Sequence, residues 1–374
     1  MTSADLPEPD RIDGAPHPRD TGRVIGQEPA EAAFLAAYNA GRLHHGWLLT
    51  GPRGVGKATL AWSIARFLLA TPAAEEDGLF GAPPPPETLH IDPDHPVARR
   101  MRALSEPGLF VLRRGATDKG DRLANDIRVS EVRRMANFFQ LSATDGGRRV
   151  VIVDAADELN TQAANALLKM LEEPPARTTL LLISHQPARL LPTIRSRCRA
   201  LRLAPLSAPD MAAALDQAGV SAPEDPEELA ALAALSSGSV GAAVRLCTEG
   251  GLELYAQLAA LYATLPRLDR ARAVALSNAA ASGDPARLDL LFQLNDLLLA
   301  RLARTGASGM PPRTEAAPGE AAMLTRLAPS PAAGRAWAET QLAISARVAH
   351  ARAVNLDPAA LVLDTVFRMQ QTSA

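Results

Sequence analysis

One glycine-rich turn that ends in lysine constrains the fold of this chain more than any other stretch. Residues 51–57 read GPRGVGK and match the pattern GxxxxGK. An apolar run at residues 47–50 precedes the turn, and residues 58–70, rich in Ala and Leu, follow it. A strand, a glycine-rich loop and a helix in this order cradle phosphate with backbone N–H groups, a lysine and the helix N-terminus. The residues predicted to bind nucleotide phosphates are Gly51, Gly54, Gly56 and Lys57.

The residue after the lysine departs from the usual pattern. A Ser or Thr hydroxyl at this position normally ligates Mg²⁺, but this chain has Ala58. Thr59 comes one residue later, and its side chain is rotated by about 100° around the helix, so we do not expect it to reach the metal. We keep Thr59 as a candidate nucleotide-binding residue of a site that looks degenerate.

A second candidate position ends another apolar strand. Residues 150–153 read VVIV and are followed by Asp154. In proteins with a GxxxxGK loop such an aspartate holds Mg²⁺. A strand-end aspartate that caps a turn is the alternative. Hydrolytic proteins of this type need a glutamate next, to orient the attacking water, and this chain has Ala155. Two chemical parts of an ATPase are therefore missing.

The remaining pattern predicts an α/β fold. Apolar runs without alternation recur at residues 109–112, 150–153, 180–183 and 200–203. Helical patterns lie at residues 28–42, 129–140 and 160–173. Strands of this kind alternating with helices indicate a parallel sheet that is covered on both faces. After residue 205 the chain is rich in Ala and Leu and shows no strand pattern.

These changes in pattern predict the domain organisation. Residues 71–107 contain four consecutive prolines and predict a long surface insertion. A Gly- and Pro-containing loop is expected at residues 305–319. The predicted segments are a disordered tail at 1–22, an α/β P-loop domain at 23–205, a small helical lid at 206–250 and an all-α domain at 251–374.

Composition argues against binding to nucleic acid through overall charge. The 39 basic and 41 acidic residues nearly cancel, leaving a formal charge of −2. Arginine doublets such as Arg99-Arg100 have no interleaved aromatic residues to stack on bases. A nucleic-acid-binding module stays an alternative, with at most weak contacts to phosphates.

The number and spacing of cysteines and histidines indicate whether the chain could bind a metal and in which cellular compartment it is expected. Two separated cysteines exclude a four-cysteine zinc site and fit a reducing cytoplasm. A metal at His90, Asp92, Asp94 and His95 is less expected than a solvated loop, so no metal site and no zinc are predicted. The first 22 residues lack the apolar core of a signal peptide, and no apolar stretch is long enough to span a membrane.

Two arginines flank a serine shortly before the last predicted strand, in the order Arg195-Ser196-Arg197-Cys198. An arginine that projects from the surface here could reach the γ-phosphate bound by a neighbouring subunit and stabilise the transition state, as an arginine finger does. An ion-paired surface arginine is the simpler interpretation of the spacing alone.

Together these motifs resemble the clamp-loader branch of the AAA+ ATPases. The matching segments read VIGQ at 24–27, GPRGVGK at 51–57, NALLKMLEEPP at 165–175 and SRC at 196–198. The likeness covers residues 23 to about 250 and is closest to the bacterial DNA polymerase III clamp-loader subunits, of the delta prime or tau/gamma type. It implies an α/β P-loop (AAA+) parallel-sheet domain, a helical lid and an all-α collar domain for oligomerisation.

The departures from the family pattern favour the delta prime type. Besides Ala58 and Ala155, the lid motif reads GSVG, with Gly241 where an arginine is expected. The cysteine-rich zinc module of the motor subunits is absent, and SRC is retained. The resemblance thus implies a structural subunit that donates Arg197 in trans. An active tau/gamma-type ATPase is the alternative.

The resemblance also implies partners. These are the tau/gamma ATPase subunits and the delta subunit of the clamp loader, with the sliding clamp and primed DNA inside the assembly, and no membrane. The chain would be a component of a DNA-directed DNA polymerase holoenzyme without activity of its own. Whether it still binds ATP and Mg²⁺ stays open.

Overall fold

The computed structural model describes residues 8, 11, 14–71, 84–117, 119, 122–141, 147–281 and 285–373, with only the backbone at 140, 141, 280 and 281. The chain forms two compact units. The first comprises Met1–Gly219 with Ser239–Gly241, and the second comprises Val220–Gly238 with Ala242–Ala374. The predicted boundaries at 205 and 250 stay a prediction, and each unit is described by itself.

The first unit is built on a parallel sheet. Its strands are β1 (Gly46–Thr50), β2 (Leu109–Arg113), β3 (Arg149–Asp154), β4 (Thr178–Ser184) and β5 (Arg199–Arg202). Their order is β2-β3-β4-β1-β5, and every neighbouring pair is parallel. Strand β1 lies between β4 and β5 and places Leu49 opposite Ile183 and Leu201. The predicted α/β P-loop fold with a parallel sheet is confirmed.

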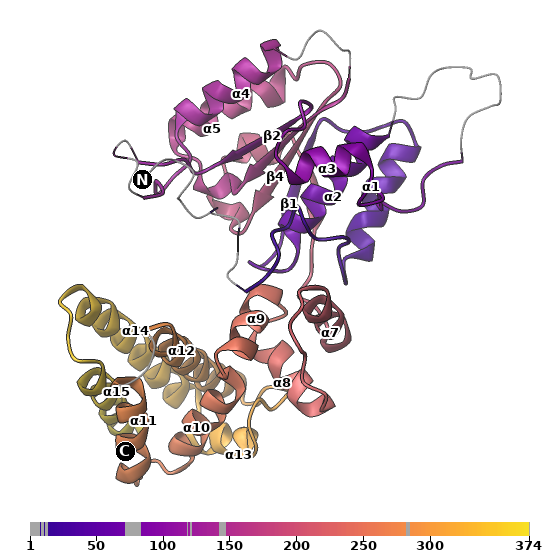
Figure 1. The fold of residues 1–374 in the computed structure, drawn as a ribbon. Coiled ribbons are helices and arrows are strands. Elements are labelled where there is room, and N and C mark those ends of the chain that lie inside the picture. Colours follow the sequence, from indigo (N-terminus) through magenta and orange to yellow (C-terminus); the bar gives the residue numbers. More distant parts are fainter. Residues whose placement is uncertain are drawn as a thin grey trace. The chain divides into compact units, whose positions relative to one another are not determined.

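Helices cover both faces of this sheet. The helices of the first unit are α1 (Glu28–Asn39), α2 (Lys57–Ala70), α3 (Pro96–Arg102), α4 (Val129–Leu141), α5 (Thr161–Glu172), the short α6 (Pro192–Arg195) and α7 (Ala208–Gln217), with 3₁₀ turns η1 (Ala156–Glu158) and η2 (Pro187–Arg189). In Figure 1, α4 and α5 lie side by side on one face, and α1, α2 and α3 lie on the other. Side chains of a strand alternate between faces, so Val151 and Val153 pack with α4 and α5. This explains why the strands are apolar throughout.

Helix α5 shows how local sequence fixes an element. The Asn160 side chain caps it by accepting a 2.9 Å hydrogen bond from the backbone N–H of Ala163. Leu167 and Leu171 bury its apolar stripe in the core. The helix ends at Glu172, two residues before Pro174, which disfavours helical backbone in the residue before it.

Two segments that were expected in a tail and in a surface insertion contain described residues that contact the rest of the first unit. Residues 14–22, expected in a disordered tail, pack on α2, where His17 is buried and contacts the Trp62 ring edge-on. The Arg66 guanidinium donates to the carbonyl of Arg19. Within the expected insertion at 71–107, helix α3 buries Met101 against the first unit, while residues 72–83 lie outside the described part. These few buried residues could not be recognised within a polar, proline-rich composition.

The second unit is all-helical. Its helices are α8 (Pro226–Leu235), α9 (Val240–Thr248), α10 (Gly251–Ala263), α11 (Arg270–Ala281), α12 (Pro285–Ser308), α13 (Glu320–Leu327), α14 (Pro331–Ala353) and α15 (Pro358–Ser373). Helix α12 extends through residues 305–308, which were expected in a loop. A β-carbon on Gly306 would lie 2.6 Å from Cα of Gly334, so two glycines let α12 and α14 cross closely.

Across the described ranges, no single helix is long and apolar enough to cross a membrane. The bent pair α8 and α9 meets that test by length and composition alone.

Candidate functional site

The GxxxxGK turn connects β1 to α2 through backbone that requires glycine. Gly51 and Gly54 have φ angles of 145° and 80°, a region that L side chains rarely adopt. A β-carbon on Gly51 would lie 2.5 Å from the carbonyl oxygen of Leu203, which follows β5. Gly56, with φ of 95°, forms the N-cap of α2. The turn therefore leads directly into a helix N-terminus, as the sequence predicted.

Lys57 lies inside this turn. Its side chain is 3% exposed, and Nζ donates a 2.8 Å hydrogen bond to the carbonyl of Gly51 and another to that of Pro52. Burial lowers the pKa of Lys57 to about 8, although the carboxylates of Asp154 and Asp157 partly offset this effect. The ammonium is thus a cation whose proton is held less firmly than in water.

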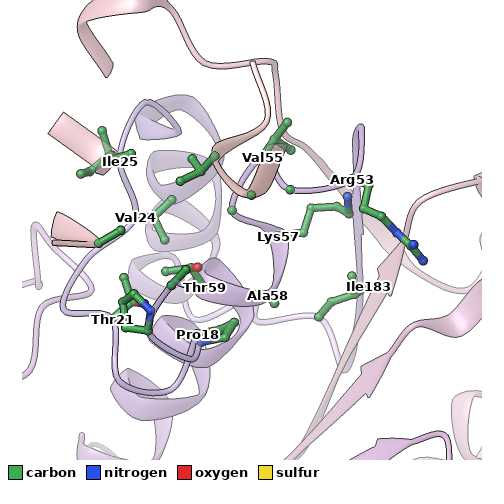
Figure 2. A pocket seen from close by; sticks show the side chains of 18 of the residues that line it. Pro18, Thr21, Val24, Ile25, Arg53, Val55, Lys57, Ala58, Thr59 and Ile183 are labelled. Atoms are coloured by element: carbon green, nitrogen blue, oxygen red, sulfur yellow. The ribbon is translucent and has the colours of Figure 1, made fainter. Parts of the chain in front are cut away.

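A cavity of about 330 Å³ opens beside the turn (Figure 2). It brings together most of the predicted site residues. Those that line it are Gly54, Gly56, Lys57, Thr59 and Asp154. Gly51 is not among the lining residues and contributes by accepting the hydrogen bond from Lys57.

The walls of the cavity differ at its two ends. Lys57 and the N-terminus of α2 supply positive charge and N–H groups at one end. Val24, Ile25 and Leu206 supply an apolar wall elsewhere. In Figure 2 the Thr59 hydroxyl lies on the side of Val24 and Thr21, away from Lys57. Cationic and apolar walls in one cavity are suited to a nucleotide, whose phosphates and base need opposite surroundings.

Two positions that line the cavity lack the oxygen-bearing side chains that a hydrolytic Mg²⁺ site usually has there. Ala58 lines it without a hydroxyl, and Ala155 lines it beside Asp154 without a carboxylate. Within the described residues, no three His, Cys, Asp or Glu side chains are grouped to hold a metal. In the segment weighed for metal binding, His95 instead caps α3 through Nδ1, and Asp92 accepts from the backbone N–H of Asp94.

His185 lines the cavity and was not selected from the sequence. Its backbone N–H donates a 2.9 Å hydrogen bond to Oδ1 of Asp157. Burial lowers the pKa of its imidazole to about 4, and the nearby cations Lys57 and Arg53 add to the shift, so the ring is neutral at neutral pH. Its position just after β4, at the carboxyl edge of the sheet, is the signal that could have identified it.

Gln27 of the VIGQ segment ties the N-terminal side of the cavity to the turn. Its side chain is 3% exposed and donates to the carbonyls of Val55 at 3.1 Å and Ala204 at 2.8 Å. Its Oε1 accepts a 3.1 Å hydrogen bond from the N–H of Ala204. These bonds satisfy a buried amide and join the start of α1 and the segment after β5 to the loop that would hold phosphate.

The GSVG segment also contacts the turn. The backbone N–H of Val240 donates a 3.0 Å hydrogen bond to the carbonyl of Gly54, and Gly241 lines the cavity. Arg245, which belongs to the second unit, pairs with Glu249 at 3.3 Å. The position where the motor subunits carry an arginine therefore faces the cavity with no side chain.

Arg197 lies outside the cavity, between α6 and β5. Its side chain is 38% exposed, and Nη2 lies 2.9 Å from Oε1 of Glu172. Nη1 donates a 3.1 Å hydrogen bond to the carbonyl of Thr193. The adjacent Cys198 packs against the core, and burial raises its pKa to about 12, so its thiol stays protonated. An ion-paired surface arginine describes Arg197 in the single chain, and its role as a finger stays a prediction.

Comparison with known proteins finds relatives of this chain by sequence. Residues 26–207 match the family described as DNA polymerase III, delta subunit. The chain is 42% identical over 217 residues to DNA polymerase III subunit delta' of Pseudomonas aeruginosa, covering 57% of this chain and 59% of that protein. It is 36% identical over 214 residues to the Escherichia coli subunit of the same name, covering 57% of each. The matches span less than two thirds of these relatives.

Proteins of the related subunit type also match. The chain is 31% identical over 182 residues to DNA polymerase III subunit gamma/tau of Mycobacterium tuberculosis, covering 48% of this chain and 28% of that protein. Among solved structures, a DNA polymerase III gamma subunit-related protein of Thermotoga maritima superposes with a TM-score of 0.42 at 14% identity, covering 91% of this chain and 100% of that one. The Holliday junction motor RuvB of the same organism gives a TM-score of 0.38 at 15% identity, covering 77% of this chain and 79% of that one.

The expected resemblance to bacterial DNA polymerase III clamp-loader subunits is confirmed by the sequence matches, with delta' relatives ahead of gamma/tau in identity. Residues 26–207 of this chain are similar to the family described as DNA polymerase III, delta subunit.

Proposed function

We propose that this chain is a non-hydrolysing structural subunit, of the delta' type, in a DNA polymerase III clamp loader. In this role it assists the ATP-dependent loading of a sliding clamp onto primed DNA. Its partners are the tau/gamma ATPase subunits and the delta subunit, and its location is the cytoplasm. The chain itself is not an enzyme but a component of the polymerase holoenzyme.

The cavity beside the GxxxxGK turn carries this proposal. Lys57 and Asp154 still line it, but Ala58, Ala155 and Gly241 line the positions where a motor subunit needs a hydroxyl, a carboxylate and an arginine. A fold that keeps the phosphate loop and lacks three catalytic side chains fits a subunit that has kept the shape of an ATPase without its chemistry. Any ATP held here would serve as a structural ligand.

The second part of the proposal concerns Arg197. Its side chain is 38% exposed and lies outside the chain's own cavity, so another subunit can approach its guanidinium from solvent. A guanidinium that meets the γ-phosphate of a neighbouring tau/gamma subunit would neutralise charge in the transition state. The chain would thereby complete an ATPase site that it does not contain.

The test is reconstitution of the clamp loader with an Arg197→Ala chain. We expect the variant to assemble and to reduce clamp loading by at least about ten-fold, since an arginine finger contributes a large factor to turnover. Arg195→Ala is the matched control, because Arg195 lies two residues earlier and is also exposed. It should leave clamp loading unchanged. An assembled Arg197→Ala complex with normal ATPase activity and normal loading would remove the finger from the proposal.

An active ATPase of the tau/gamma type is the second candidate. The burial of Lys57 in a preserved phosphate loop favours it, as does the 31% identity to a gamma/tau subunit. It predicts Mg²⁺-dependent ATP hydrolysis by the purified chain alone, whereas the structural subunit has none.

A further inference from the structure

We propose that Glu172 is a latch on Arg197, which holds the guanidinium on its own chain until the phosphate of a neighbouring subunit displaces the carboxylate. The inference rests on the proposed role of Arg197 as a trans-acting finger. It adds a residue that controls how readily the finger is released. Glu172 acts only through Arg197 and touches no reacting atom, so it is a positioning residue.

The contact uses the groups that a phosphate would need. Oε1 of Glu172 lies 2.9 Å from Nη2 of Arg197, and the carbonyl of Thr193 accepts from Nη1 at 3.1 Å. A guanidinium binds phosphate most strongly through two of its nitrogens in parallel. In the single chain, Nη1 already donates to a carbonyl, and Nη2 already lies within ion-pair distance of a carboxylate. A phosphate oxygen must compete with Glu172 for at least one of them.

The two residues are held together by the fold and not by chance packing of surface side chains. Glu172 ends α5, and the preceding Leu171 is buried in the core. Gly46, at the start of β1, packs against both segments: a β-carbon there would lie 3.0 Å from Cδ2 of Leu171 and 3.1 Å from the carbonyl oxygen of Arg197. His45 Nε2 also lies 2.9 Å from the carbonyl oxygen of Leu171. The backbones that carry the ion pair are therefore fixed.

The side chains themselves remain exchangeable. Arg197 is 38% exposed and Glu172 is 44% exposed, so water screens the pair and little free energy is needed to separate it. The carboxylate also places a negative charge beside the guanidinium, which lowers the attraction that an incoming phosphate feels. The competition by Glu172 and its negative charge both disfavour contact between Arg197 and ATP on the neighbouring subunit. Neither changes how Arg197 acts once that contact has formed.

Glu172→Gln tests this assignment in the reconstituted complex with tau/gamma and delta subunits. The amide keeps the shape of the side chain and removes its charge. We expect the ATP concentration for half-maximal ATPase activity to fall by about two- to five-fold, the range by which an exposed ion pair shifts an equilibrium. The maximal rate should stay unchanged. Glu173→Gln, the adjacent exposed glutamate, is the matched control and should change neither quantity.

The double variant Glu172→Gln/Arg197→Ala separates the latch from other effects of the substitution. If Glu172 acts through Arg197, adding Glu172→Gln to Arg197→Ala changes nothing further. A half-maximal concentration that stays the same or rises in Glu172→Gln overturns the latch, as does a lower maximal rate, which would mean that Glu172 orients the bound finger. If Arg197→Ala is itself without effect, the finger in the proposed function fails instead, so the two failures are distinguishable.

Discussion

Gly54 and Ser239 approach so closely that a β-carbon on Gly54 would lie 2.1 Å from Oγ of Ser239. The glycine belongs to the turn between β1 and α2, whereas the serine lies about 180 residues later in the GSVG segment. Val240 strengthens this approach through its hydrogen bond to the Gly54 carbonyl. The shape of the phosphate loop is thus held from outside by a segment distant in sequence.

Gly54→Ala should therefore destabilise the first unit. The substitution strains a φ of 80° and forces the Ser239 hydroxyl to move. Gly41→Ala is the control, because Gly41 has a φ of 65° and nothing within 4 Å of the added carbon. We expect a loss of about 1–2 kcal/mol in the control from backbone strain alone and a larger loss in Gly54→Ala. Urea unfolding followed by tryptophan fluorescence measures both.

Ser239→Ala tests why Gly54→Ala should lose more unfolding free energy than Gly41→Ala. If contact with the hydroxyl produces it, combining Ser239→Ala with Gly54→Ala should recover most of the difference from Gly41→Ala. Equal losses in Gly54→Ala and Gly41→Ala would show that the turn tolerates the added carbon and that its contact with the GSVG segment is loose.

The purified chain should not hydrolyse ATP. The cavity retains Lys57 but has Ala58 and Ala155 where metal ligation and water orientation need oxygen atoms. We expect Mg²⁺-dependent phosphate release from the wild-type chain to equal that from Lys57→Ala. Turnover that is clearly above background and is lost in Lys57→Ala would mean that other residues replace the two missing groups, and the tau/gamma-type motor would become the better assignment.

His185 should make the first unit acid-sensitive. The pKa of its ring is about 4 in the folded chain, because of burial and of the cations Lys57 and Arg53, and about 6.5 in an unfolded chain. Between these values the unfolded state binds more protons, so the free energy of unfolding falls as the pH is lowered from about 6.5 to 4. Urea unfolding at several pH values should show a smaller decline in His185→Gln than in the wild type.

His90→Gln is the control for that measurement, because His90 is exposed and lies away from the cavity. Its pH dependence should follow the wild type. A wild-type decline that His185→Gln leaves unaltered would show that the imidazole is charged in the folded chain or that solvent reaches it freely.

The stability of the second unit should depend on the buried ion pair between Arg301 and Glu320. Glu320 is 1% exposed and accepts hydrogen bonds from Arg301 at 2.7 and 2.9 Å, from the backbone of Ala316 and from the hydroxyl of Tyr255. Glu320→Gln leaves the buried guanidinium without a counter-charge, which should cost about 3–5 kcal/mol. Asp269→Asn, in an exposed pair with Arg272, should cost under about 1 kcal/mol. Urea unfolding followed by circular dichroism compares them, and similar losses would contradict the prediction.

Much of the first unit could be predicted because its signals are local. The spacing of GPRGVGK depends on residues that are neighbours along the chain, and so do the apolar runs that become β1 to β5. Steric restrictions on φ and ψ and the burial of a strand on both faces act within a few residues. Predicted strand boundaries therefore differ from the observed ones by no more than two residues, as at β4, expected at 180–183 and found at Thr178–Ser184.

The packing of residues 14–22 and of α3 could not be predicted in this way. His17 and Met101 are single buried residues within polar, proline-rich sequence, and their burial depends on surfaces such as that of Trp62 on α2. The average composition of a segment does not reveal single residues that become buried, whereas a packed contact needs only one or two of them. Prolines that argue against regular structure also do not prevent a segment from lying against a core.

The sequence by itself predicted the glycine-rich turn and the parallel sheet. It also shows that positions 58 and 155 are alanines without side-chain oxygen atoms. Each of these follows from residue type and short-range spacing. Only the tertiary structure decided that His185 and Gly241 face the same cavity and that Glu172 meets Arg197. These contacts depend on strand order and on how distant segments pack, which no periodicity along the chain encodes. Local sequence thus determined the turn between β1 and α2, and long-range packing determined which residues line the cavity beside it.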